Sequence, residues 1–143
     1  MKNGFSLVEV MIAFVIILVA LSAIVKVYMV SLHAGSYADN LSYATTLADA
    51  KLHTLETFSP DTPDLKASWY KDPDNPLRLN SRNFSRFWSV KDIKNAKEIT
   101  VYVTWDDHKR GSSSNFGSLS DLSGSKCAKL SLKGYVLGSV NSE

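Results

Sequence analysis

The first part of the chain is a long run of apolar residues. Every residue from Val10 to Leu21 is apolar, and between Phe5 and Val25 only Glu9 is charged. As a helix, this stretch of about 21 residues would be about 30 Å long, which matches the hydrocarbon core of a bilayer. The length therefore predicts a membrane-spanning segment rather than a helix buried in a protein core.

The helical period continues beyond Lys26, where polar residues such as Asn40 are expected on the other faces. Pro60 and Pro63 cannot continue a helix, so we predict one helix over about residues 5–57. A two-chain coiled coil is an alternative for its second half, but small residues would weaken the seam. We expect instead that the second half packs on its own chain through a stripe with helical spacing: Val27, Val30, Ala34, Tyr37, Leu41, Ala44, Ala48, Leu52 and Leu55.

The rest of the chain predicts a small sheet. Alternating apolar residues predict strands over 98–105 and about 127–137, whereas residues 59–97 read as irregular, with a short strand at 86–90. The Ser/Gly-rich segment 106–126 is expected to be a loop that is mobile or contacts a partner. Together with the long helix this gives an α+β fold with a small antiparallel sheet. Bulky aromatic residues are expected to cover the helix: Trp69, Tyr70, Phe84, Phe87 and Trp88.

The length and composition of the chain predict a single domain and give little further information about function. The chain has 143 residues and a net charge of +2, and its basic residues are dispersed, so no nucleic-acid partner is expected. Cys127 is the only cysteine, which excludes an intrachain disulfide and predicts a buried thiol. One basic series interleaved with aromatic residues suggests a single-stranded DNA surface only faintly, and its cations are expected to point outward: Arg78, Arg82, Arg86 and Lys91.

Glu9 needs an explanation because a carboxylate in hydrocarbon costs several kcal/mol and is rarely kept without a partner. Cleavage just before Phe5 would create an α-amino group about one helical turn away, and a neighbouring copy would offer the same amine. A secretory signal peptide is the rival interpretation. Lys2 supplies only a weak basic region, however, and the apolar period continues past any cleavage site without a break.

The segment Gly4-Phe5-Ser6-Leu7-Val8-Glu9, placed before the apolar run, resembles the class III signal of type IV prepilins and type II secretion pseudopilins. The resemblance implies cleavage between Gly4 and Phe5 by a prepilin peptidase and N-methylation of Phe5. It implies that Glu9 forms a salt bridge with the N-terminus of a neighbouring subunit during assembly. It also implies that five apolar residues pack in the fibre core: Val10, Ile12, Phe14, Ile17 and Leu21.

The same resemblance implies a division of the chain. Residues 1–4 would be a leader, residues 5–26 the membrane-spanning and filament-core half of the helix, and residues 27–143 a periplasmic head that includes the amphipathic half. The chain would cross the inner membrane once and then enter a pilus or pseudopilus fibre. Its partners would be the peptidase, other minor and major pilins or pseudopilins, the inner-membrane assembly platform and membrane lipid.

A minor subunit is favoured over a major one. Lys26 stands where major pilins commonly carry a helix-bending proline, and the strand from Ile99 to Trp105 loosely resembles minor pilins of the PilV type and pseudopilins of the GspI group. Such a subunit would help to prime or cap assembly. The alternative is a membrane-tethered head that binds DNA or a secreted substrate and is not built into a fibre.

No catalytic or cofactor motif is present, so neither an enzyme nor a cofactor is expected. His33, His53 and His108 are scattered along the sequence. Asp106 and Asp107 with Asp121 are only a weak candidate for Ca²⁺, because two adjacent acids usually mark a turn. We therefore expect no metal site.

Overall fold

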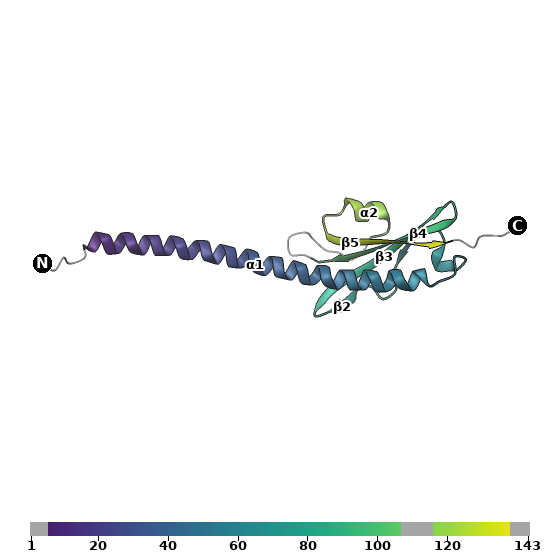
Figure 1. The fold of residues 1–143 in the computed structure, drawn as a ribbon, viewed down its shortest axis with the longest axis horizontal. Helices are drawn as coiled ribbons and strands as arrows, with labels where there is room; N and C mark the ends of the chain where they lie inside the picture. The colour runs from purple at the N-terminus through teal and green to yellow at the C-terminus, as the bar shows by residue number, and fades with distance from the viewer. Residues whose placement is uncertain (1–5, 107–115, 138–143) are drawn as a thin grey trace. The chain divides into compact units, whose positions relative to one another are not determined.

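The computed structural model describes residues 6–106 and 116–137, and it confirms the predicted α+β, pilin-like architecture (Figure 1). One long helix precedes a small antiparallel sheet, and the chain divides into compact units at the boundary between Asp39 and Asn40. The elements in chain order are α1 (Leu7–Glu56), η1 (Pro63–Leu65), β1 (Trp69–Lys71), β2 (Leu77–Leu79), β3 (Arg82–Ile93), β4 (Ala96–Trp105), α2 (Leu119–Gly124) and β5 (Ala128–Leu137).

The sheet is antiparallel throughout and follows the order β1-β3-β4-β5, with β2 also paired to β3. Its centre is the long β3–β4 hairpin, in which Phe84 lies opposite Trp105 and Ile93 opposite Ala96. Strand β5 pairs with β4 over its whole length. The two strands predicted from apolar alternation are therefore β4 and β5, close to their expected bounds.

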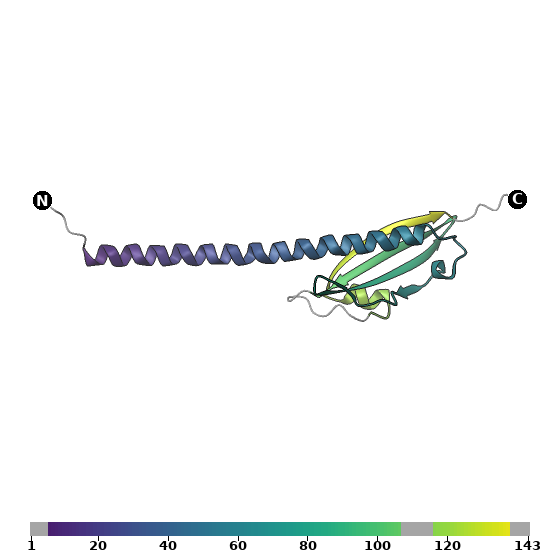
Figure 2. The same ribbon diagram turned by 90° about the horizontal axis from the view of Figure 1, so that it is seen from below.

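The part of α1 that begins at Asn40 lies across one face of the sheet (Figure 2). Because side chains alternate along a strand, every second residue of β3, β4 and β5 faces this helix. The resulting hydrophobic core is drawn from both layers: Ala44, Ala48, Leu52 and Leu55 of α1, Phe84, Trp88 and Val90 of β3, and Ile99, Val101, Val103 and Trp105 of β4.

The predicted packing stripe on the helix was wrong over its first part. Val27 and Val30 are 70% and 68% exposed, and Leu41 is also exposed. Asn40, which was expected on a polar face, is buried instead. The reason is that Arg82 of β3 donates a hydrogen bond to the side-chain oxygen of Asn40, so the packed region starts with a polar contact that an apolar period cannot reveal.

The short strand predicted at 86–90 lies within β3, but the prediction that the rest of 59–97 is irregular was wrong, because η1, β1 and β2 also lie there and β3 is much longer. Ser85 and Ser89 interrupt the apolar pattern of β3, yet both are buried. They lie on the sheet face opposite α1, where Thr100 and Thr104 of β4 are their cross-strand neighbours. The sheet face opposite α1 is therefore also covered, and it buries small polar residues that the sequence pattern suggested were exposed to solvent.

An aromatic cluster covers part of that second face, so the aromatic residues do not all cover the helix as expected. Phe87 stacks on Trp69 with ring centroids 5.6 Å apart and meets Phe116 edge-on at 5.9 Å. Tyr102 also lies near Trp69, with ring centroids 5.6 Å apart. In contrast, Tyr70 stacks on Trp88 at the helix-facing core.

Helix α2 lies within the segment that was predicted to be a loop; residues 107–115 of that segment are outside the described residues. The Ser118 hydroxyl accepts a hydrogen bond from the backbone N–H of Asp121 and so caps the start of α2. At the other end, Lys129 Nζ donates to the carbonyl oxygens of Leu122, Ser123 and Ser125 at 2.8, 3.2 and 3.4 Å. A cation at a helix C-terminus is favourable, and Leu122 is buried.

Cys127 is buried, as predicted, directly before β5. Its sulfur lies 3.0 Å from the hydroxyl of Ser125. The thiol is therefore a small packed group at the junction of α2 and β5.

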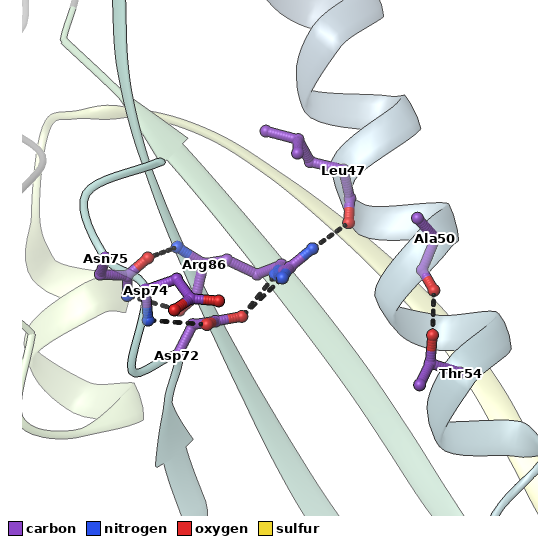
Figure 3. Close-up of polar contacts among 7 residues, drawn as sticks. All are labelled: Leu47, Ala50, Thr54, Asp72, Asp74, Asn75 and Arg86. Atoms are coloured by element: carbon purple, nitrogen blue, oxygen red, sulfur yellow. Dashed lines mark hydrogen bonds and ion pairs between the residues drawn. The ribbon is translucent and has the colours of Figure 1, made fainter. Parts of the chain in front are cut away.

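A buried ion pair joins the loop after β1 to β3 and α1 (Figure 3). Asp72 is 2% exposed, and its carboxylate lies 2.7 Å from the guanidinium of Arg86, which also donates to the carbonyl of Leu47 at 3.0 Å. The side chain of Asn75 bonds both the backbone N–H and the backbone carbonyl of Arg86. Arg86 was expected to point outward, but its position between Phe84 and Trp88 places it on the helix side of β3.

Candidate functional site

The surface most in need of a partner is the N-terminal part of α1. From Leu7 to Leu32 the large apolar side chains are each 50–76% exposed. Uninterrupted runs such as Val15–Val19 place them on every face of the helix, since successive residues are about 100° apart. A helix that is apolar all round belongs in a larger protein core or in a membrane.

This helix is long and apolar enough to cross a membrane, with a mean hydropathy of 2.9 in its most apolar window. None of that window is buried inside the chain itself. The described residues contain one helix of this kind, and it lies near the N-terminus. An isolated apolar surface this large is unfavourable in water, so the segment requires lipid or other helices around it.

Glu9 lies in the first turn of α1 and is exposed. The helix begins with backbone hydrogen bonds from the N–H groups of Glu9 and Val10 to the carbonyl oxygen of Ser6. An acid in this position is favoured by the helix dipole, whose positive end lies at the N-terminus. The carboxylate is the only charge between Leu7 and Val25, and a cation brought to the helix start would meet it.

Gly4 and Phe5, the predicted cleavage and methylation residues, lie outside the described residues. The assembly role of Glu9 and the fibre-core role of the apolar residues stay predictions, because both need a neighbouring subunit. Four of the five core residues share one helix face, since steps of four, three and four return to the same side, whereas Ile12 is on the opposite side. All five are 53–61% exposed: Val10, Ile12, Phe14, Ile17 and Leu21.

Two of the four cations in the basic series contact other groups of the head, whereas Arg78 and Lys91 are exposed. Arg82 holds Asn40, and Arg86 holds Asp72 and Leu47. Within residues 6–106 and 116–137 no group of three His, Cys, Asp or Glu side chains is placed to hold a metal ion. Asp107 and His108 lie outside the described residues.

Lys133 and Glu98 form an exposed ion pair on the sheet face opposite α1, with 3.1 Å between Lys133 Nζ and Glu98 Oε1. The hydrogen bond to Glu98 and its charge raise the pKa of Lys133 above the ordinary 10.5. Because the pKa of this lysine is higher in the folded than in the unfolded chain, the pair stabilises the fold fully at pH values below the unfolded-state pKa. This stabilisation is lost as the pH rises through the folded-state pKa. The pair is therefore intact at neutral pH.

One comparison with known proteins gave a match, and this match lies in the N-terminal part of the chain. The family model for the prokaryotic N-terminal methylation motif matches residues 1–25. Searches of curated proteins and of solved structures gave no match. The motif covers the predicted leader, the predicted cleavage point and the first part of the apolar helix, and it supports a type IV pilin-like protein that a prepilin peptidase processes and that assembles with other pilins.

The sequence alone did not reveal the groups that attach the head to its helix, above all Asp72, Asn75 and Arg86. Asp72 and Asn75 lie within residues 59–97, a segment that was predicted to be irregular apart from a short strand at 86–90. A usable signal was present, however. Arg86 is two residues from both Phe84 and Trp88, so it lies on the same face of the strand as they do. A cation on a face that is directed into the protein predicts a buried acid nearby.

Proposed function

We propose that this chain is a minor pilin or pseudopilin, a non-enzymatic structural subunit that helps to prime or cap a type IV pilus or type II secretion pseudopilus. Residues 5–26 anchor it in the inner membrane, with the head in the periplasm, until the apolar helix moves from lipid into the fibre. The absence of proline between Met1 and Ser59 supports a minor rather than a major role.

The observation that carries the proposal is the exposed apolar segment of α1, which has a single carboxylate in its first turn and lies mostly within the matched methylation motif. A plain membrane anchor gains nothing from this acid, because a charge in hydrocarbon is costly. A subunit that docks beside a neighbour's α-amino group gains a pair of opposite charges that offset each other's desolvation. The presence of this acid therefore supports a segment that moves out of lipid and packs against another protein.

Replacing Glu9 with Val tests this proposal. We expect Glu9→Val to insert into the membrane at least as well as the parent chain, since it removes the only charge between Leu7 and Val25. Its recovery in sheared fibres should nevertheless fall at least tenfold, which corresponds to the loss of about 1.4 kcal/mol in docking. Quantitative immunoblots of the membrane and sheared fractions measure both quantities.

Met11→Val is the matched control, because Met11 is also exposed on the same helix and carries no charge. This variant should enter fibres normally. Equal recovery of Glu9→Val and the parent chain in the sheared fraction would refute the docking role.

A further inference from the structure

The two edges of the sheet differ sharply. On one side the sheet ends in β1 and β2, which span only three residues each. On the other side it ends in β5, which spans ten residues and pairs with β4 alone. Short edge strands are a common way to prevent another chain from adding to a sheet, whereas a long edge strand is a template for such addition.

The outer side of β5 has unpaired backbone groups within the described part of the chain. In an antiparallel pair, alternate residues direct their N–H and C=O groups away from the partner strand. Outside the β4–β5 ladder, none of the backbone hydrogen bonds among the described residues involves a residue of β5. About half of the strand's backbone groups therefore have no backbone partner among the described residues, and a further strand would satisfy them.

The two lysines on β5 do not protect this edge in the usual way. Lysine side chains often guard an edge strand by extending over it into solvent. Here Lys129 is held by three carbonyl groups at the end of α2, and Lys133 is held by Glu98. Both cations are directed back onto their own chain, so the edge beside them stays accessible.

The side chains along β5 define what would fit beside it. On the helix side, Leu130 and Leu132 pack against the core but remain only half-buried. On the opposite face, Lys129 and Lys133 are exposed at alternating positions. A strand placed next to β5 would bring one set of its side chains beside the leucines and the other set beside the lysines.

We propose that β5 is a docking edge for an extended segment of another protein, which joins the sheet as an additional strand and carries apolar and acidic side chains at alternating positions. The apolar set covers Leu130 and Leu132, and the acidic set lies beside Lys129 and Lys133. Main-chain hydrogen bonds supply the affinity and the alternating side chains supply the specificity. This surface is separate from the apolar part of α1 and does not depend on fibre assembly.

A second copy of the chain fits this edge less well. Pairing two β5 strands would place the exposed lysines of one copy beside those of the other, and like charges on neighbouring strands are destabilising. Only Glu98 offsets them among the described ion pairs of this face. The charge pattern therefore favours an acidic partner strand over self-association.

Amide hydrogen exchange of the full chain in detergent micelles tests the proposal. In the free protein, alternate amides of β5 should exchange rapidly. A ten-residue peptide of alternating Glu and Val is the probe, and we expect it to slow these amides at least tenfold. The same peptide with an N-methyl group on every residue should have no effect, because it has no N–H group to donate to the ladder.

Two further comparisons test the charge pattern. A peptide of alternating Lys and Val should bind at least tenfold more weakly than the Glu and Val peptide. Lys133→Gln, a change at an exposed residue, should weaken binding of the acidic peptide about two- to fivefold, as expected for an exposed pair.

Several results would overturn the proposal. Uniform protection of every β5 amide in the free protein would show that the edge is already paired. No slowing by the acidic peptide would exclude strand addition of this kind, and equal slowing by the basic peptide would exclude charge selection. Protection that rises with protein concentration in the absence of peptide would assign the edge to a second copy.

Discussion

Gly134 marks a close approach between α1 and the sheet. A Cβ atom built at this position would lie 2.2 Å from Glu56 Oε1 and 2.9 Å from Leu52 Cδ1. The glutamate can move because its end is flexible, but Leu52 belongs to the core that joins the helix to the sheet. Gly134 therefore fixes how closely the helix packs on β5, which is a common reason for a glycine inside a strand.

We expect Gly134→Ala to lower the free energy of unfolding of the head by about 1–3 kcal/mol, the usual cost of inserting an atom group into a packed core. Urea unfolding of the full chain in detergent, followed by tryptophan fluorescence, measures this change. Gly35→Ala is the control, because nothing lies within 4 Å of a Cβ at Gly35 and Ala favours a helix by about 1 kcal/mol. Equal stability of Gly134→Ala and the parent would show that the helix does not pack this closely.

The Asp72–Arg86 pair gives a second prediction for single residues. Removing one partner of a buried pair leaves an uncompensated charge, so Asp72→Ala should destabilise the head by about 3–5 kcal/mol. Asp92→Ala is the matched control, because its ion pair with Lys97 is exposed and should contribute at most about 1 kcal/mol. The same urea titration compares the two variants, and equal losses would contradict the assigned burial of Asp72.

At the scale of elements, apolar periodicity predicted α1, β4 and β5 well because each has one uninterrupted pattern. It could not predict the full length of β3, whose Ser85 and Ser89 are covered by a second layer. It also missed α2, a short helix whose ends are held by polar side chains, Ser118 at its N-terminus and Lys129 at its C-terminus, which an apolar period does not reveal. The apolar segment and Glu9 could be recognised from the sequence because they form one contiguous pattern.

The turn between β2 and β3 also depends on backbone geometry that apolar periodicity does not show. Leu79 lies opposite Arg82, and the two residues between them, Asn80 and Ser81, have φ values of 46° and 62°. Two positive φ values are typical of a two-residue turn whose twist matches that of a hairpin. Asn tolerates this conformation through its short polar side chain, whereas Ser has no such advantage.

Ser81→Gly should therefore stabilise the head by about 1 kcal/mol, because glycine adopts positive φ without steric cost. The opposite sign is expected for Ser131→Gly in the middle of β5, where glycine costs about 0.5–1 kcal/mol. Thermal unfolding followed by circular dichroism compares the two substitutions. A loss of stability in Ser81→Gly would contradict the turn geometry.

At the scale of the whole molecule, two parts of the chain have different requirements. The head buries its own core between α1 and the sheet and covers part of the second sheet face with aromatic residues and α2. The apolar segment from Leu7 to Leu32 buries none of its large side chains within the chain. Its environment must therefore come from outside, first from lipid and then, in the proposed function, from the helices of neighbouring subunits.

Intact-mass and N-terminal analysis of the protein isolated from membranes and from sheared fibres tests the account most directly. We predict a chain that begins at Phe5 and carries one additional methyl group on its α-amino nitrogen, which places that cation near the acid at the foot of α1. A chain in fibres that retains Met1, or a chain cut beyond residue 20, would contradict the account.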